Sequence, residues 1–536
     1  CGAPSLRASL PDPGLFRDME AAAARIADAV IGGETITLFA DYDVDGATSA
    51  AILIRHLRAL GANPSHYIPD RLLEGYGPSI EALLMLRNSG TSLLLLLDCG
   101  TQAFAELEAA RAAGLDVIVV DHHKASATLP PAVAVVNPNR FDEQADGGIA
   151  AQHGHLCTAG LAFLLAVAVQ RALRRRGWFS GPEPDLAPLL DLVALGTVAD
   201  VMPLVGLNRV FVALGLRRLQ ARRNIGLEAL LEVARIEQPD AASLGYALGP
   251  RVNAGGRVGT ADLGVRLLTT GDRAEAMQLA RELDALNAAR RQIEAQVTQE
   301  ALDLADPQAP LAIVAGEGWH PGVIGIAAAR LKERLERPAI VIARDGDRPA
   351  RGSGRSIAGV DLGAAVLEAK DRGLLLAGGG HAMAAGLTVH PDQLEALRGF
   401  LCDRLGPAVA AAVGARALAI DLAVTATGLS PALVDALEAA GPYGQGWPAP
   451  RVAVGPVKLV EATRVGHDAA HVRLVGTGPG GGRVKAILFR GAETALGGAL
   501  LAGRGRRLQL CGRPVRNSWQ GQVSAELHLD DAAPAD

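Results

Sequence analysis

Residues Thr35–Ala40 (TITLFA), followed by Asp41-Tyr42-Asp43-Val44-Asp45-Gly46, give the clearest indication of the fold class of this chain. Its first six residues form a short apolar run rich in β-branched side chains, which is typical of a buried strand. Three acids come directly after this run, and the helix-forming segment Thr48–Leu60 follows them. A buried strand, an acidic turn and a helix together predict the first unit of an α/β domain.

Three more apolar runs repeat this arrangement over the next hundred residues. Each predicted strand ends at polar residues or at a proline-containing turn, and helical segments separate the strands. Because the runs are apolar throughout, they fit a parallel sheet covered by helices on both faces. The runs are Ser92–Leu97 before Asp98-Cys99-Gly100, Asp116–Val120 before Asp121-His122-His123, and Ala132–Val136 before Asn137-Pro138.

The acids and histidines that end these strands are expected to lie close together. The carboxyl ends of strands in an open parallel sheet share one edge, and ligands bind there. A further acid, Asp200, follows an apolar helix. Carboxylates packed together repel one another unless cations neutralise them, and Asp-rich sites with one or two imidazoles suit Mn²⁺ or Mg²⁺ better than Zn²⁺. The sequence therefore predicts a site for two such ions, which can hold a hydroxide and stabilise displacement at phosphorus.

The bland alternative for the DxDxD motif is a solvated turn or a helix cap, and for a lone motif it would be the better interpretation. Four acidic or histidine-containing elements on one predicted edge favour the metal site instead.

The remaining sequence predicts three further parts. Arg273–Leu304 has no Gly or Pro and would form a helix about 48 Å long, suited to connecting two lobes. A second α/β pattern begins near Leu311, and short strands separated by glycines after Pro450 predict a small barrel of the oligonucleotide-binding (OB) kind. The expected boundaries are 1–235 for the first domain, 236–306 for a linker with the long helix, 307–405 for the second domain, 406–449 for a linker, 450–530 for the barrel and 531–536 for a disordered tail.

Composition excludes several classes of protein. Hydrophobic residues make up 49% of the 536 and charged residues 20%, which rules out a disordered or fibrous chain. The net charge of −5 gives no global basic field for nucleic acid. Five scattered cysteines without a CxxC pair argue against a disulfide framework or a zinc cluster and favour a reducing cytoplasm. No apolar run approaches the roughly 18 residues that span a bilayer, so no membrane association is expected.

The acidic motifs also resemble a known family. Asp41-Tyr42-Asp43-Val44-Asp45-Gly46, Asp98, Asp121-His122-His123 and Asp200 match, in order, the four motifs of the DHH phosphoesterase superfamily. Further motifs narrow the resemblance to the RecJ family of single-strand-specific DNA exonucleases, over roughly residues 10–530. They are Tyr67–Arg71 with Glu74–Gly77, Gly249–Arg257, Leu286-Asn287 through Glu294, Trp319–Ile326, Gly352–Ser356 and Gly378–Gly386.

The resemblance implies roles for individual residues. Asp43, Asp98 and Asp41 would hold one metal ion, and Asp98 would bridge to a second ion held with Asp45, His122 and Asp200. His123 would lie beside the scissile phosphate and stabilise its charge, so His123, Asp98 and His122 are the expected catalytic residues. The implied fold is a DHH catalytic domain, a connecting helix, a DHHA1 domain that faces the metals across a cleft, and an OB fold.

The resemblance also implies the activity and its setting. The expected enzyme removes mononucleotides from single-stranded DNA in the 5′→3′ direction and acts in DNA repair and recombination. Its expected partners are single-stranded DNA, a single-strand-binding protein and a helicase, and it would work as a cytoplasmic monomer. Two rivals are a phosphodiesterase for short or cyclic oligonucleotides on the same core and a catalytically silent strand-binding factor. The barrel and the long helix disfavour the first rival, and the complete set of acids disfavours the second.

Glycine-rich and basic segments outside the acids are candidates for binding DNA. Gly378-Gly379-Gly380-His381 offers consecutive backbone N–H groups for an anion nest, and Gly352–Ser356 adds hydroxyls and a guanidinium, although each segment alone also fits a tight turn. Exposed aromatic rings would stack on unpaired bases, and arginines would contact phosphates or pair with nearby acids. The candidate substrate-binding residues are Arg71, Tyr76, Arg251, Asn253, Arg257, Ser353, Arg355, Gly380, His381 and Trp519. Trp519 lies on the predicted barrel, which also carries a group of arginines: Arg504, Arg506, Arg507, Arg513 and Arg516.

Two positions depart from the pattern of the family. Trp447 in Gly444-Gln445-Gly446-Trp447-Pro448 replaces a common Asn, which puts a linker contact in doubt. Thr158 replaces a usual Gly in Leu156–Gly160, and a small shift of that loop is expected.

Overall fold

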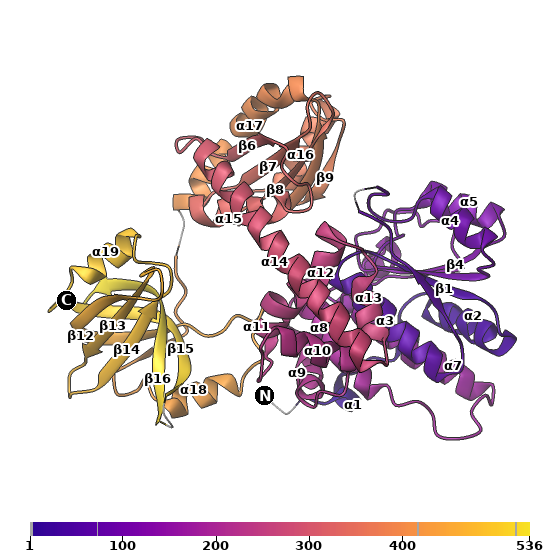
Figure 1. The fold of residues 1–536 in the computed structure, drawn as a ribbon, viewed down its shortest axis with the longest axis horizontal. Coiled ribbons are helices and arrows are strands. Elements are labelled where there is room, and N and C mark those ends of the chain that lie inside the picture. The colour runs from indigo at the N-terminus through magenta and orange to yellow at the C-terminus, as the bar shows by residue number, and fades with distance from the viewer. Residues whose placement is uncertain (1–3, 72, 149, 415–416, 520–521, 536) are drawn as a thin grey trace. The chain divides into compact units, whose positions relative to one another are not determined.

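The computed structural model describes residues 4–71, 73–148, 150–414, 417–519 and 522–535, without the side chains of Asp146 and Trp519. Residues 11–200 and 215–417 form one compact unit. Residues 201–214 and those from 418 onward, with the N-terminal residues up to Leu10, form a second unit. Figure 1 shows the elements of both units. Within the described residues, no helix is both long and apolar enough to cross a membrane.

The first unit begins with the predicted parallel sheet. Its five strands have the order β2-β1-β3-β4-β5, and every pair is parallel. The four predicted strands are confirmed, and β2 was not predicted because its residues Ser65-His66-Tyr67 are polar and lie at the edge of the sheet. The strands are β1 (Ile36–Ala40), β2 (Ser65–Tyr67), β3 (Leu93–Leu97), β4 (Asp116–Val120) and β5 (Ala134–Val136).

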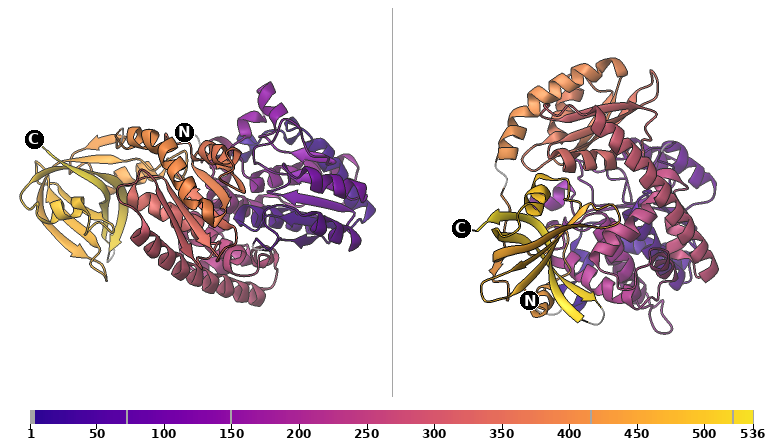
Figure 2. Two further views of the ribbon diagram at one scale, coloured as in Figure 1. Left: turned by 90° about the horizontal axis from the view of Figure 1, so that it is seen from above. Right: turned by 60° about the vertical axis from the view of Figure 1, so that its left-hand side comes forward.

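Helices cover both faces of this sheet, as its apolar strands require (Figure 2). One face packs on α4 and α5 through a cluster that includes Phe39, Leu83 and Leu107. The other face packs on α2, α3 and α7. The helices of this part are α2 (Met19–Gly32), α3 (Val44–Ala59), α4 (Ile80–Asn88), α5 (Phe104–Ala112), α6 (Phe141–Asp146) and α7 (Thr158–Arg175), whereas α1 (Leu6–Ser9) belongs to the second unit.

A helical layer then leads to the second domain. The predicted helix over 273–304 is confirmed as α14 (Arg273–Leu304), which packs on α10 and α12 in its first part and on α15 (Ile324–Leu335) further along. A π-helical turn, Leu244–Leu248, runs directly into α12. The other helices are α8 (Leu190–Ala199), α10 (Ile225–Val233), α11 (Ala241–Ser243), α12 (Gly249–Val258) and α13 (Leu263–Thr269), and α9 (Gly206–Gln220) begins in the second unit and ends in this one.

The second domain is built on a mixed sheet with the order β6-β7-β8-β10-β9. Strands β6 and β7 are parallel, and the other pairs are antiparallel. Helix α15 packs on one face with α14, while α16 and α17 pack on the other. The elements are β6 (Ala312–Glu317), α15 (Ile324–Leu335), β7 (Ala339–Arg344), β8 (Ala350–Arg355), α16 (Leu362–Asp371), β9 (Ala377–His381), β10 (Ala384–Val389) and α17 (Leu394–Gly414).

The glycine-rich segments of this domain are strands, so the predicted turn and anion nest are wrong. Gly352–Arg355 lies in β8, and Gly378–His381 lies in the edge strand β9. Successive N–H groups of a strand point in opposite directions, whereas a nest needs them to converge on one point.

The second unit contains the predicted small barrel. Its sheet has the order β11-β12-β13-β14-β16-β15, and β12 also pairs with β15, which closes the barrel around a core of valines and leucines. The elements are β11 (Leu422–Val424), α18 (Pro431–Glu438), β12 (Val452–Val465), β13 (His471–Thr477), β14 (Arg483–Leu488), α19 (Ala495–Leu501), β15 (Arg507–Trp519) and β16 (Gln522–Pro534).

Two expectations about this region are corrected. Residues 406–449 are not only a linker, because α17 continues to Gly414 and β11 pairs with β12 in the barrel sheet. Residues 531–534 of the expected disordered tail are ordered, because β16 pairs with β15 as far as Pro534. The Asp530 carboxylate also accepts a hydrogen bond from Arg451 Nε at 2.9 Å.

Trp447 makes the linker contact that the sequence left in doubt. The Arg209 guanidinium lies over its ring, 5.0 Å from the centroid, and its indole N–H donates to the Ala440 carbonyl at 3.1 Å. Leu204 N also donates to the Gln445 carbonyl at 2.7 Å. The segment before the barrel is therefore fixed to the start of α9 by stacking and backbone contacts.

Candidate metal centre

The three acids after β1 are held by the start of α3. The Asp43 carboxylate caps this helix and accepts hydrogen bonds from the backbone N–H groups of Asp45 (2.9 Å) and Gly46 (3.1 Å). A Cβ on Gly46 would lie 2.2 Å from the Asp41 carbonyl oxygen, so only glycine allows the turn to fold back this tightly. The motif therefore includes a helix cap, which was the structural alternative to a metal site. It also leaves Asp41 and Asp45 buried beside the sheet edge.

The adjacent strands add the other groups at this edge. Asp98 directly follows β3 in the left-handed backbone region (φ 62°) and is 2% exposed. Asp121, His122 and His123 follow β4, which is the next strand of the sheet. Asp200 caps the C-terminus of α8.

These residues form three overlapping groups of potential metal ligands. Within each group the donor atoms lie within 4.8 Å of one another. His122 Nε2 lies 3.3 Å from an Asp98 oxygen and 3.5 Å from an Asp200 oxygen. The groups are Asp41–Asp43–Asp98, Asp45–His122–Asp200 and Asp98–His122–His123, so the structure brings together every residue that the sequence proposed as a metal ligand.

The electrostatics of the cluster fit divalent cations. Burial raises the pKa of Asp98 and of Asp200, and the charges of the neighbouring aspartates raise both further. Asp41 Oδ1 and Asp200 Oδ2 are buried and have no hydrogen-bond partner among the described residues. Buried carboxylates without donors are costly unless a cation compensates them, and oxygen ligands with one imidazole suit Mn²⁺ or Mg²⁺.

Asp121 orients His123, a role that sequence reasoning did not assign. The Asp121 carboxylate lies 2.7 Å from His123 Nδ1 and accepts the backbone N–H groups of His122 and His123. Burial alone would lower the pKa of His123, but the hydrogen bond and charge of Asp121 raise it above its ordinary value. Burial instead lowers the pKa of His122. His123 is therefore suited to carry a positive charge, and His122 to act as a neutral ligand.

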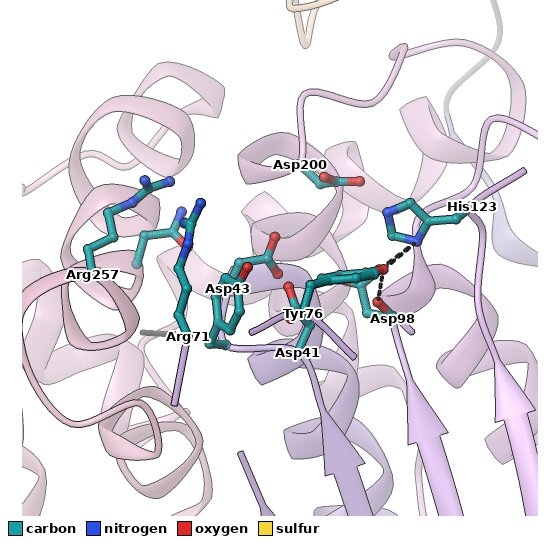
Figure 3. Close-up of a pocket in the computed structure, with 10 residues that line it drawn as sticks. Asp41, Asp43, Arg71, Tyr76, Asp98, His123, Asp200 and Arg257 are labelled. Atoms are coloured by element: carbon teal, nitrogen blue, oxygen red, sulfur yellow. Dashed lines mark hydrogen bonds and ion pairs between the residues drawn. The ribbon is translucent and has the colours of Figure 1, made fainter. Parts of the chain in front are cut away.

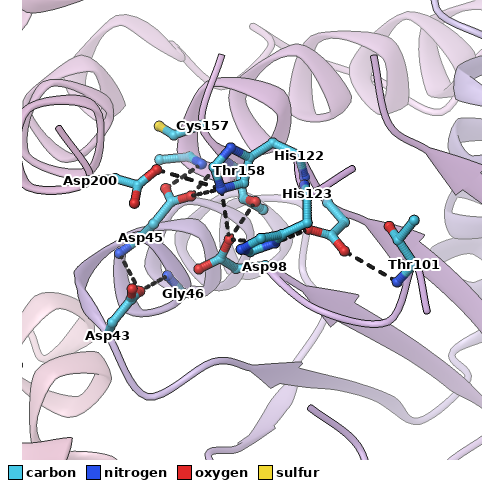
Figure 4. A network of polar contacts seen from close by, with 12 residues as sticks. Asp43, Asp45, Gly46, Asp98, Thr101, His122, His123, Cys157, Thr158 and Asp200 are labelled. Carbon is cyan, nitrogen blue, oxygen red and sulfur yellow. Dashed lines mark hydrogen bonds and ion pairs between the residues drawn. The ribbon is translucent and has the colours of Figure 1, made fainter. Parts of the chain in front are cut away.

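Thr158 is the second contributor whose role the sequence did not give (Figure 4). It is the first residue of α7, where its backbone N–H and that of Ala159 donate to the Asp45 carboxylate at 2.7 and 2.8 Å. Its hydroxyl donates to Asp98 Oδ1 at 3.1 Å. Thr158 therefore contacts two acids, Asp45 and Asp98, which between them belong to all three groups. The signal in the sequence was its replacement of glycine.

A cavity of about 220 Å³ opens beside the acids (Figure 3). Tyr76 lies over it, with its hydroxyl 3.1 Å from the Asp98 carbonyl oxygen and 3.3 Å from His123 Nδ1, and with 55% of the residue exposed. Arg71 packs its guanidinium over the Tyr42 ring at 5.0 Å. The remaining lining residues are Asp41, Asp43, Asp98, His123, Asp200, Asn253 and Arg257.

Helix α12 carries three of the predicted substrate-binding residues, of which Asn253 and Arg257 line the cavity and Arg251 does not. Asn253 Oδ1 accepts a hydrogen bond from Val44 N at 3.1 Å, and Arg257 donates to the Gly322 carbonyl at 3.0 Å. Burial, with the nearby charge of Arg71, lowers the pKa of Arg257 to about 10. Arg251 does not line the cavity but pairs with Asp284 at 2.9 Å, which is the structural alternative that the sequence left open.

The candidates from the second domain lie outside the lining of this cavity. Arg355 donates to the Ser353 hydroxyl at 3.1 Å, and burial together with the charge of Arg71 lowers its pKa, which places it near the basic side of the cavity. Gly380 and His381 lie on the edge strand β9. The side chain of Trp519 lies outside the described part of the chain.

Three family models match the chain, and together they follow its fold. The N-terminal domain of the DHH family matches residues 35–197, the DHHA1 domain matches 308–406, and the RecJ OB domain matches 420–531.

Relatives and solved structures match nearly the whole chain. The single-stranded-DNA-specific exonuclease RecJ of Dickeya dadantii is 37% identical over 522 residues, which cover 94% of this chain and 88% of the relative. The crystal structure of RecJ from Thermus thermophilus in complex with Mn²⁺ is 31% identical with a TM-score of 0.80, over 97% of this chain and 72% of that one. The Mg²⁺ complex of the Thermus thermophilus protein is 30% identical with a TM-score of 0.73, over 97% and 71%. With its acidic and histidine cluster and its three matching domains, this chain belongs to the RecJ family of single-stranded-DNA-specific exonucleases.

Proposed function

We propose that this chain is a metal-dependent exonuclease that degrades single-stranded DNA from the 5′ end, releases mononucleotides, and acts in DNA repair and recombination. The observation that carries the proposal is the buried cluster in which Asp98 belongs to two of the three ligand groups beside an open cavity. A carboxylate shared in this way is suited to bind two ions, and the neighbouring acids would supply further ligands to each ion. Contacts with a single-strand-binding protein and a helicase stay predictions.

The residues of the cluster divide the work of hydrolysis. When bound, Mn²⁺ or Mg²⁺ would activate a phosphodiester as a Lewis acid. His123 is held by Asp121 at 2.7 Å, and the hydrogen bond and charge of Asp121 raise its pKa, so it would stabilise the charge that develops on the scissile phosphate. Asp45 is fixed by two backbone N–H groups of α7 and is therefore oriented before any ligand arrives.

The basic residues around the cavity would bind and position the strand. Arg71 and Arg257 line it, and Arg355 lies close enough to Arg71 for their charges to interact. A terminal phosphate carries up to one more negative charge than an internal phosphate, and charge-assisted donors would favour it. The half-exposed ring of Tyr76 would stack on a base, which only an unpaired strand can present.

The experiment that tests the proposal is a time course on single strands labelled at one end or the other. We expect Mn²⁺-dependent release of the 5′ label as mononucleotides before the 3′ label, and no release in a chelator. Early release of the 3′ label would refute the polarity. Faster hydrolysis of a dinucleotide than of a long strand would favour the short-oligonucleotide phosphodiesterase, and tight binding without hydrolysis would favour the silent strand-binding factor.

The same assay tests the recognition of the strand end. We expect Arg355→Ala to lose most of the preference for a 5′-phosphorylated over a 5′-hydroxyl strand, measured as the ratio of the two kcat/KM values. If the substitution lowers both values equally, Arg355 supports general backbone binding only.

A further inference from the structure

A second cavity, of about 560 Å³, lies in the DHHA1 domain. It is located at the carboxyl ends of the parallel strands β6 and β7, between the segment Gly318–Pro321 and the turn that leads into β8. The carboxyl ends of parallel strands are the usual position of ligand sites in α/β sheets. Its volume lies within the range of small-ligand sites, and it shares no lining residue with the cavity of the metal centre.

The wall of this cavity is basic, and its arginines are poorly neutralised. Among the described residues, Arg351 has no ion pair and no side-chain hydrogen bond. Arg348 pairs with Asp345 at 2.9 Å, but both side chains are about four-fifths exposed, so solvent screens the pair. Arg344 lies 3.8 Å from Glu317, and its buried Nε has no hydrogen-bond partner in the described part of the chain. This charge balance favours an anionic ligand.

One charge interaction and one hydrogen bond connect the surroundings of this cavity to the metal centre. Arg351, Ser353 and Arg355 alternate along β8, so they lie on one face of that strand. Arg351 lines the second cavity, and Arg355 lies near Arg71 of the first. The segment that carries His320 is also fixed to the first cavity, because Arg257 donates to the Gly322 carbonyl at 3.0 Å. A row of polar side chains therefore runs from one cavity to the other.

The apolar part of the wall suits a nucleobase. The Trp319 indole is 6% exposed and packs against Gly316, where a Cβ would lie 2.1 Å from the ring. Its N–H donates to Glu300 at 2.6 Å, which fixes the ring to α14. His320 beside it accepts the backbone N–H of Gly322 through Nδ1 at 3.0 Å and is held in place. The cavity thus combines a buried, hydrogen-bonded aromatic wall with the exposed guanidinium groups of Arg348 and Arg351.

We propose that this second cavity binds one nucleoside phosphate, with the phosphate held by Arg348 and Arg351 and the base against His320 and Trp319. The ligand would come from one of two sources, a released mononucleotide or a nucleotide of the DNA strand. Only the identity of these two sources rests on the proposed function as an exonuclease. The binding itself requires neither metal nor hydrolysis.

The test is calorimetric titration of the full chain with deoxyadenosine 5′-monophosphate in the presence of a chelator. We expect the double variant Arg348→Ala/Arg351→Ala to bind at least tenfold more weakly than the wild type. Arg398→Ala is the matched control, because Arg398 makes a comparable i,i+3 pair with Glu395 in α17 away from the cavity, and it should bind as the wild type does. Deoxyadenosine, which lacks the phosphate, should bind at least tenfold more weakly than the nucleotide.

A second titration, with a 12-nucleotide single strand, distinguishes the two sources. If the double variant loses affinity for the mononucleotide alone, the cavity takes the free nucleotide; if it loses affinity for both, it takes the strand. Equal binding of both ligands by the double variant and the wild type would overturn the proposal. Because no turnover is measured, failure of the exonuclease assay leaves this result readable.

Discussion

Asp98 adopts a left-handed backbone conformation that non-glycine residues seldom adopt, and Asn and Asp tolerate it best. The conformation turns its carboxylate toward His122 and the Thr158 hydroxyl. Strain of this kind persists where the surrounding structure imposes it, commonly at functional sites. Asp98 therefore combines an unusual backbone with membership of two ligand groups.

We expect Asp98→Asn to abolish hydrolysis without unfolding the protein. Asparagine keeps the shape and tolerates the backbone, but it removes the charge that both ion positions need. Turnover of a single strand in Mn²⁺ should fall below about 1% of wild type, a loss of roughly 3 kcal/mol or more of transition-state stabilisation. The melting temperature should stay the same or rise, because repulsion among buried carboxylates decreases. Asp392→Asn, at an exposed position, is the control and should keep wild-type activity. If Asp98→Asn keeps more than about 1% of wild-type activity, Asp98 is not a ligand that both ions need.

The hydroxyl of Thr158 should increase the affinity of the site for metal ions. Thr158→Val keeps the volume but removes the donor to Asp98, and we expect the dissociation constant for Mn²⁺ to rise about tenfold, as is typical for loss of a group that orients a ligand. Thr158→Ser keeps the hydroxyl and should bind nearly as the wild type. Free Mn²⁺ measured by paramagnetic resonance reads this directly. An unchanged constant in the valine variant would show that the hydrogen bond does not orient Asp98.

At the scale of elements, the apolar periodicity and strand-end acids predicted the first sheet, because burial on both faces leaves a clear pattern. The glycines of β8 misled the prediction for a physical reason. A Cβ on Gly352 would lie 2.6 Å from Leu387, and one on Gly354 would lie 2.6 Å from Leu362. Glycine is present there because neighbouring leucines pack on the strand, which the local sequence does not reveal. The roles of Asp121 and Thr158 likewise depend on contacts that only the tertiary fold creates.

Helix α14 contains a buried polar network whose disruption should destabilise the fold. Arg290 donates to Glu294 at 2.8 Å and to Asn287 at 2.9 Å, and Arg330 of α15 lies 3.3 Å from Glu294. Glu294→Ala would leave Arg290 buried without a carboxylate, at a cost of about 3–5 kcal/mol in unfolding free energy. The exposed Glu282→Ala in the same helix should change it by less than about 0.5 kcal/mol. Urea unfolding measures both, and equal small effects would show that the network does not stabilise the fold.

Helix α3 should make stability depend on pH through His56. This residue is 2% exposed, and burial lowers its pKa from 6.5 to about 4. Between these values the unfolded chain binds the proton and the folded one does not, so stability is complete above pH 6.5 and decreases as the pH falls toward 4. The shift corresponds to about 3 kcal/mol. His56→Leu should flatten the pH dependence of the melting temperature in this range, and exposed His467→Leu should not. A parallel change in both variants would contradict the prediction.

At the scale of the whole molecule, the barrel and the metal centre belong to different units of the chain. Several arginines of the barrel are exposed, including Arg504 and Arg506 in the turn before β15, while Arg516 pairs with Asp435. A small closed barrel with basic, exposed loops is the architecture of many single-strand binders. We therefore expect the barrel to add contacts with the strand to those made at the metal centre.

We expect removal of residues from 418 onward to weaken binding of long strands much more than binding of short ones. A strand too short to reach beyond the metal centre gains nothing from the barrel, whereas a long strand is no longer held there at all. The logarithmic salt dependence of long-strand affinity should also become shallower by about 0.7 for each phosphate that the barrel no longer neutralises. Titration of fluorescent strands of two lengths at several salt concentrations measures both effects.

Because the deletion uncovers residues 201–214, a second variant that keeps the full chain serves as a control. Arg504→Glu/Arg506→Glu should also weaken long-strand binding, with its melting temperature unchanged. Unaltered long-strand affinity in both variants would make the barrel a structural or partner-binding domain.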